Sequence, residues 1–137
     1  MSASYANAVP TQRSGLLRPA LVADAVVSAA NGVAYLAAAG PIGDALGLSS
    51  GLLRGVGAFF LVWAVCVALV ARTPRRGAVT AVIVLNAVWV VDSLVVAAAG
   101  WGDPTTAGTV WIVLQALAVA GLAAAQAVGR RELEGAV

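Results

Sequence analysis

Four polar side chains within one apolar stretch are the residues best placed to do chemistry in this sequence. Asp24, Ser28, Asn31 and Tyr35 are separated by four, three and four positions. This spacing puts all four on one face of an α-helix. Because the flanking residues are apolar, we expect that face to look into a helix bundle rather than at lipid. An intramembrane carboxylate is costly without a partner or a purpose, so Asp24 is the main functional candidate.

Three other apolar stretches carry polar residues that extend this face into a predicted polar seam across the membrane. With a rise of ~1.5 Å per residue, Gln126 is expected near the level of Asp24. Asn86 and Gln115 are expected with Asn31 near the midplane. The complete set of transport or seam candidates is Asp24, Ser28, Asn31, Tyr35, Arg54, Asn86, Asp92, Gln115 and Gln126.

The charged members of the seam need partners. Arg54 and Asp92 both fall in the outer third of their stretches, and an ion pair between them would allow both charges in a low-dielectric bundle. Asp24 has three alternatives: a hydrogen bond with Gln126 or Ser28, an approach by Arg72 from a loop, or a protonated state. The polar amides have a structural alternative, because Asn and Gln commonly hold membrane helices together.

Four stretches must position these residues, and they cover 17–39, 51–71, 77–99 and 106–128. Each has the ~20 apolar residues needed to cross ~30 Å of hydrocarbon. The predicted fold is an all-α, up-down-up-down membrane four-helix bundle in one domain, 16–128. Residues 1–15 are expected to be a disordered cytoplasmic tail, and 129–137 a second cytoplasmic tail.

The connections between the stretches follow from their turn residues. The sequence Gly-Pro-Ile-Gly at 40–43 is expected to stop the first helix, with an interfacial turn at 44–48. The short connection around Pro74 predicts that the second and third spans are antiparallel neighbours. Asp103 followed by Pro104 predicts an N-cap and first turn for the fourth span. Gly51 and Gly55 are expected to allow close helix packing, and the aromatic residues Phe59, Phe60, Trp63 and Trp89 to pack or face lipid.

Composition excludes several functions. The chain has 61% hydrophobic and 10% charged residues, whereas soluble domains carry about 25% charged residues. The positive net charge comes from arginines at the ends of the stretches, so no nucleic-acid partner is expected. The chain lacks histidine and has one cysteine, Cys66, which argues against a haem, a His-ligated metal and a thiol-redox pair. We expect no cofactor and no metal, and we consider an enzyme less plausible than a non-enzyme.

Arginine asymmetry predicts the orientation of the bundle. Seven of the eight arginines lie in the N-terminal tail, the middle connection and the C-terminal tail, while only Arg54 lies near the other side. By the positive-inside rule, both termini and the middle connection are cytoplasmic. The sequence thus predicts a multi-pass protein of the plasma (inner) membrane with the lipid bilayer as its surround. A bundle of four helices leaves little room for a transport pathway within a single chain, which favours a homodimer or a larger membrane complex.

The composition resembles that of small alanine- and arginine-rich integral membrane proteins of high-GC bacteria, in which arginine replaces lysine and Ala and Val dominate the spans. This resemblance covers the whole chain and assigns no site residues. The size is also similar to that of the four-helix small multidrug transporters. Their pattern has a glutamate in the first span, where this chain has Asp24, so their function is not transferred.

Three functional hypotheses follow from the sequence. The first is a non-enzymatic membrane protein whose polar seam specifies helix packing and self- or partner association. The second is a proton- or ion-coupled transporter of a small solute, with Asp24 as the titrating group. The third is an intramembrane enzyme acting on lipid head groups, for which the sequence offers no spaced nucleophile and base.

Overall fold

The computed structural model describes residues 15–135, and this part of the chain is entirely helical apart from short connections. Its helices are α2 (Leu17–Ala37), α3 (Ala39–Leu46), α4 (Ser50–Arg72), α5 (Arg76–Ala99) and α6 (Thr106–Gly135). All except the short α3 are long and apolar enough to cross a membrane. The predicted all-α four-helix bundle is therefore confirmed, and the chain has the architecture of a small multi-pass membrane protein. The expected tail at 1–15 falls almost wholly outside the described residues.

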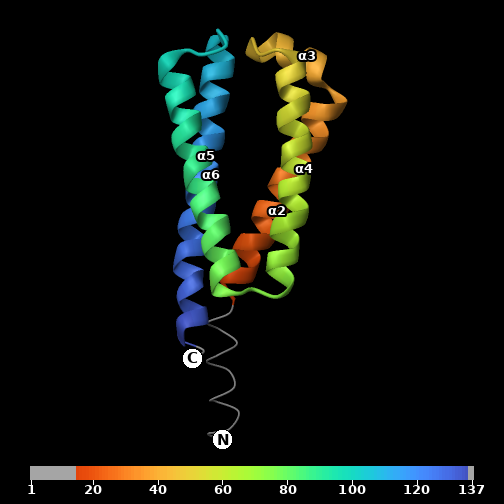
Figure 1. Cartoon of the computed structure of the whole chain (residues 1–137). Helices are drawn as coiled ribbons and strands as arrows, with labels where there is room; N and C mark the ends of the chain where they lie inside the picture. Colours follow the sequence, from red (N-terminus) through yellow and green to blue (C-terminus); the bar gives the residue numbers. More distant parts are fainter. Residues whose placement is uncertain (1–14, 136–137) are drawn as a thin grey trace, which may run out of the picture.

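The four long helices form two closely packed pairs, α2 with α4 and α5 with α6 (Figure 1). The pairs meet mainly through α2 and α6, whereas α4 and α5 hardly touch although they are consecutive. The prediction that the second and third spans are neighbours is thus wrong for most of their length. The short connection between Arg72 and Arg76 holds only their adjoining ends together, and the two helices separate toward the other end of the bundle (Figure 1).

The end of the first span differs from the prediction. The helix breaks at Ala38, whose φ of −129° and ψ of 35° are not helical, and α3 begins directly after it. Gly40 and Pro41 therefore lie in the first turn of α3 instead of ending the first span. Proline is tolerated there because the first-turn N–H groups have no intrahelical acceptor. α3 ends at Gly47, whose φ of 71° favours glycine.

The last span also departs from its predicted limits. Thr105 caps α6, since its Oγ1 accepts a hydrogen bond of 3.1 Å from the N–H of Gly108. The predicted cap, Asp103, instead has a left-handed φ of 55° in the preceding turn. At its other end α6 continues through most of the expected tail at 129–137, where Arg130 and Glu134 form an ion pair of 2.7 Å one turn apart on the helix.

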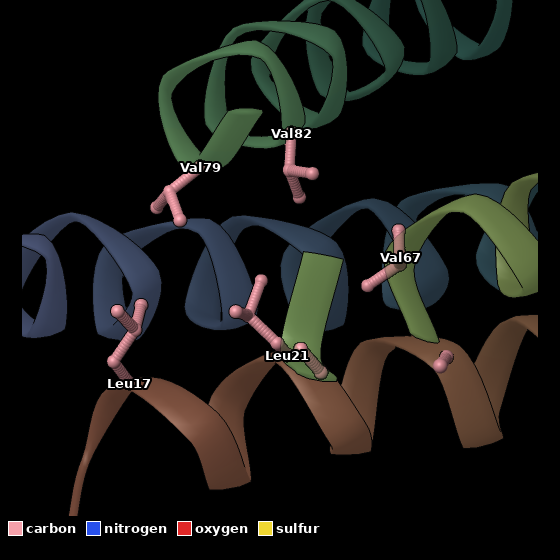
Figure 2. Close-up of a cluster of buried hydrophobic side chains, with 7 residues drawn as sticks. Leu17, Leu21, Val67, Val79 and Val82 are labelled. Atoms are coloured by element: carbon pink, nitrogen blue, oxygen red, sulfur yellow. The ribbon is translucent and has the colours of Figure 1, made fainter. Parts of the chain in front are cut away.

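Apolar side chains seal the end of the bundle that holds the α4–α5 connection. We call this group the inner plug; Figure 2 labels five of its members and shows Val79 and Val82 of α5 directed toward Leu17 and Leu21 of α2. Leu21 and Val79 are completely buried. The inner plug consists of Leu17, Leu21, Ala25, Val67, Ala71, Val79 and Val82.

Glycine brings α2 and α4 together, but at different positions from those predicted. A Cβ added to Gly32 would lie 2.9 Å from the carbonyl oxygen of Gly57. A Cβ added to Gly57 would likewise lie 2.9 Å from the carbonyl oxygen of Gly32. Small residues of this kind allow membrane helices to approach backbone to backbone. Gly51 and Gly55 do not have this role, because an added Cβ would meet nothing within 4 Å at either position.

Candidate functional site

Asp24 lies at the centre of a polar cluster just above the inner plug, and it is only 3% exposed. Its Oδ2 accepts hydrogen bonds from Nδ2 of Asn86 at 2.7 Å and from Nε2 of Gln126 at 2.8 Å. Its Oδ1 accepts weaker bonds from Ser28 Oγ at 3.3 Å and from Trp63 Nε1 at 3.4 Å. The donors belong to all four long helices, so this one carboxyl group links the whole bundle.

The amides of this inner polar cluster also bond to each other. Asn86 Nδ2 donates to Gln126 Oε1 at 3.1 Å, and Asn86 and Gln126 are 5% and 0% exposed. The predicted bonds of Asp24 with Gln126 and Ser28 are therefore confirmed. The predicted depth of Asn86 is wrong: it lies at the level of Asp24, not with Asn31 and Gln115. The 2.7 Å bond to Asp24 fixes this level, which counting along the chain did not resolve.

The approach of Arg72 to Asp24, the second alternative, is not observed. Arg72 is exposed at the end of α4, and its carbonyl oxygen accepts a hydrogen bond of 3.4 Å from Nη2 of Arg18. Nε of Arg18 donates to the carbonyl of Ala71 at 3.0 Å. A cation thus satisfies the free carbonyls at this helix end, as the helix dipole favours, and the cation remains outside the bundle.

A second set of polar bonds lies nearer the other end of the bundle. Trp89 Nε1 donates to Gln115 Oε1 at 3.0 Å, and Gln115 Nε2 donates to Ser93 Oγ at 3.2 Å. Trp111 Nε1 donates to the hydroxyl of Tyr35 at 2.7 Å. We call these five residues the outer polar cluster. The predicted continuous seam is thus resolved into two clusters.

Three predicted seam residues stay outside both clusters. Nδ2 of Asn31 bonds to the carbonyl of Val27 on its own helix at 3.0 Å, so it does not link helices. Arg54 and Asp92 are both exposed and do not form the predicted ion pair. Within residues 15–135 the one ion pair is between Arg130 and Glu134. Because α4 and α5 separate at this level, the two side chains have no common interior in which to meet.

A cavity of about 400 Å³ lies between the two helix pairs and reaches down to Asp24. Ser28, Asn31 and Asn86 line it beside Asp24, and Asp92 and Gln115 line it farther out. A second, smaller cavity of about 230 Å³ shares Trp89, Asp92, Trp111 and Gln115 with the first and also reaches Tyr35. The polar face predicted for the first span does look into the bundle, because all four of its residues line one of these cavities.

Tryptophan and phenylalanine residues contribute more to this site than the sequence indicated. Trp63 and Trp89, expected only to pack or face lipid, both donate indole N–H groups to polar side chains in the bundle. The signal that could have found them is the indole N–H itself, which seeks an acceptor once it is buried. Phe59 and Phe60 line the cavity together with the two indoles.

No family model matches the chain, and neither the curated proteins nor the solved structures include a significant match to it. The site must therefore be interpreted from its own chemistry. Among residues 15–135 no group of three or more potential metal-binding side chains is present. What the arrangement offers is a carboxylate held by neutral donors at the closed end of a cavity with polar and aromatic walls.

Proposed function

We propose that this chain is a proton- or ion-coupled carrier that binds a small solute in the cavity between the helix pairs. The observation that carries the proposal is the position of Asp24, which lies at the closed end of a 400 Å³ cavity and bonds to side chains of α4, α5 and α6. Cavities of ~300–1,000 Å³ with a few convergent polar groups are typical binding sites for small molecules.

The hydrogen bonds of Asp24 provide a mechanism for coupling. All four are donated to the carboxylate by neutral groups, so an ionised Asp24 satisfies each donor. A proton on Oδ2 turns that oxygen into a donor that faces the N–H groups of Asn86 and Gln126. The bonds from this oxygen to α5 and α6 would then weaken or rearrange. Proton binding would thereby loosen the contact between the helix pairs, above the inner plug that closes the cavity.

Transient charge movement offers a direct test that does not require the solute to be known. The full chain in proteoliposomes on a solid-supported membrane is exposed to a step in pH, and the current from proton binding is recorded. We expect a transient current that Asp24→Asn abolishes. Asp103→Asn is the matched control, since Asp103 lies in an exposed turn outside both cavities. An unchanged current in Asp24→Asn would refute the coupling role.

Cysteine labelling tests whether water reaches the cavity. In a Cys66→Ala background, single cysteines at positions 31 and 115 line the cavity, whereas a cysteine at position 82 replaces a member of the inner plug. We expect a small water-soluble thiol reagent to label positions 31 and 115 and to leave position 82 unreacted. Protection of all three positions in folded protein would mean a dry core and would contradict a carrier.

Helix packing and association form the second candidate function, because hydrogen bonds among Asp24, Asn86 and Gln126 join α2, α5 and α6. Under this alternative the inner polar cluster specifies how the bundle, or a homodimer of it, assembles. The pH-step current separates the two candidates, since a purely structural cluster gives none.

The arginine distribution supports one orientation of the bundle in the membrane for either function. Arg18, Arg72, Arg75, Arg76, Arg130 and Arg131 all belong to the end of the bundle with the inner plug. By the positive-inside rule we propose that this end faces the cytoplasm of a bacterial cell and that the cavity lies toward the outer side of the inner membrane. Accessibility of labelled cysteines from one side of intact cells tests this orientation.

A further inference from the structure

The cavity walls contain aromatic rings from both helix pairs, close to one another. The ring centroids of Phe60 and Trp89 are 5.1 Å apart, with an angle of 62° between the ring planes. Phe59 lies 6.0 Å from Trp89 and 6.3 Å from Trp63. These contacts join α4 to α5 where the two backbones otherwise separate. A solute in the cavity would therefore be enclosed by aromatic rings whose π faces carry partial negative charge.

The charge of the cavity has one sign. Asp24 and Asp92 line it, and no arginine does so among the described residues. Asp24 is already held by four hydrogen bonds. Asp92 differs, because no hydrogen bond or ion pair joins it to another residue in the described part of the chain. Asp92 lines both cavities, so its carboxylate is available to a solute in either.

Carboxylate and aromatic rings together indicate the class of solute. A cation over aromatic faces is attracted to them, most strongly when it is desolvated, and it would also neutralise an intramembrane carboxylate. A small metal ion fits less well, because it requires several oxygen ligands in a tight shell and the cavity is wide and largely apolar. An anion would meet two carboxylates and no basic residue.

We propose that the cavity binds a monovalent organic cation with apolar substituents, with Asp92 as its charge partner and the rings of Phe60 and Trp89 as its contact surface. This inference rests on the carrier function proposed above and assigns separate tasks to the two carboxylates. Asp92 recognises the solute, and Asp24 couples its binding to the helix pairs.

Binding of three probes of similar shape tests the inference. Purified full-length chain in detergent is equilibrated with radiolabelled tetraphenylphosphonium, with tetraphenylborate as the anionic counterpart and triphenylphosphine oxide as a neutral one. We expect saturable binding of the cation, at least tenfold tighter than that of the neutral probe, and no saturable binding of the anion. Equal binding of the three probes, or binding of the anion alone, would overturn the proposal.

Variants locate the site. We expect Asp92→Asn to weaken cation binding at least tenfold, and Trp89→Leu to weaken it about threefold to tenfold. Asp103→Asn should bind like the original chain, because Asp103 lines neither cavity. Asp92 makes no bond that its replacement would remove, and a single symmetric peak in size-exclusion chromatography checks that the variant is folded. Unchanged affinity in folded Asp92→Asn would refute its role.

The outcome is distinguishable from a failure of the carrier function. If the pH step gives a current that depends on Asp24 but the phosphonium probe does not bind, the solute class is wrong and the carrier proposal stands. If the probe binds through Asp92 but the pH step gives no current, the chain is a binding protein without proton coupling, and the inference about the cavity stands.

Discussion

The two ends of the bundle differ in how many helices meet there. At the inner end, the inner plug joins side chains of α2, α4 and α5, and the polar cluster around Asp24 joins side chains of all four long helices. Toward the outer end α4 and α5 separate, and the space between the helix pairs is a cavity with exposed Asp92 on its wall, although α3 contacts the start of α6 at this end. The same mixture of apolar and amide side chains thus makes a closed core at one end and a cavity at the other.

This difference shows that polar residues inside a membrane protein act according to the partners within their reach. Asn86 and Asn31 are the same residue type on two long helices. Asn86 reaches across the bundle to Asp24, whereas Asn31 bonds only to Val27 of its own helix. The closed end uses its polar groups to hold helices together, whereas the open end leaves Asp92 exposed, with no bond to another residue in the described part of the chain.

Removing a large side chain from the inner plug should have the largest effect on stability. We expect Leu21→Ala to lower the free energy of unfolding by about 3 kcal/mol, because the fully buried site cannot refill the space. Leu69→Ala is the matched control, since Leu69 is 56% exposed toward lipid and should cost little. Unfolding in mixed micelles with rising SDS measures both. Equal losses in the two variants would contradict a closed inner end.

Deleting the carboxyl group of Asp24 should have the next largest effect. The three bonds it makes to other helices are worth about 0.6 kcal/mol each on average, so Asp24→Ala should cost about 2 kcal/mol. The same change at Asp92 should cost less than about 0.5 kcal/mol, because that exposed residue bonds to no described neighbour. SDS unfolding measures the loss of unfolding free energy in both variants. Equal losses would mean that the outer end is as tightly bonded as the inner end.

Glycine substitutions should show that α2 and α4 stay tightly packed against each other where the two helix pairs diverge. We expect Gly57→Ala to destabilise the protein by about 1–2 kcal/mol, because the new methyl group would press on the backbone of Gly32. Gly55→Ala on the same helix places its methyl group in open space and should be neutral or slightly stabilising. Thermal unfolding followed by circular dichroism would detect the difference; a neutral Gly57→Ala would mean that α2 and α4 separate easily.

The smallest expected effect concerns the indole bonds. Trp89→Phe keeps an aromatic ring and removes the 3.0 Å bond to Gln115. We expect a loss of about 0.6 kcal/mol. Trp63→Phe should lose less, because its bond to Asp24 is longer at 3.4 Å. SDS unfolding of the two variants, compared in the same micelles, checks this order. A larger loss for Trp63→Phe would mean that its indole contributes more to the inner polar cluster than its geometry indicates.

Much of the candidate site could be predicted from local patterns. The spacing from Asp24 to Tyr35 correctly placed four residues on a face that looks into the bundle, and counting along the helices correctly put Gln126 beside Asp24. The same counting failed for Asn86, because the positions of residues along separate helices do not decide which side chains meet. The Arg54–Asp92 pair failed because it assumed contact between consecutive helices, and that assumption came from the length of a connection.

The sequence by itself determined the class of the molecule, the number of its long helices, their limits to within two residues except at the C-terminal end of α6, and the helix face that carries Asp24. These are local properties: a span needs ~20 apolar residues, and every backbone polar group must be satisfied within the helix. Only the tertiary structure decided which helices pair, that Gly32 and Gly57 make the close contact, and that Trp63 and Trp89 bond inside the bundle. Those outcomes depend on how side chains far apart in the chain fit together. The apolar pattern of a span does not determine them, because the same apolar residues can face either lipid or another helix.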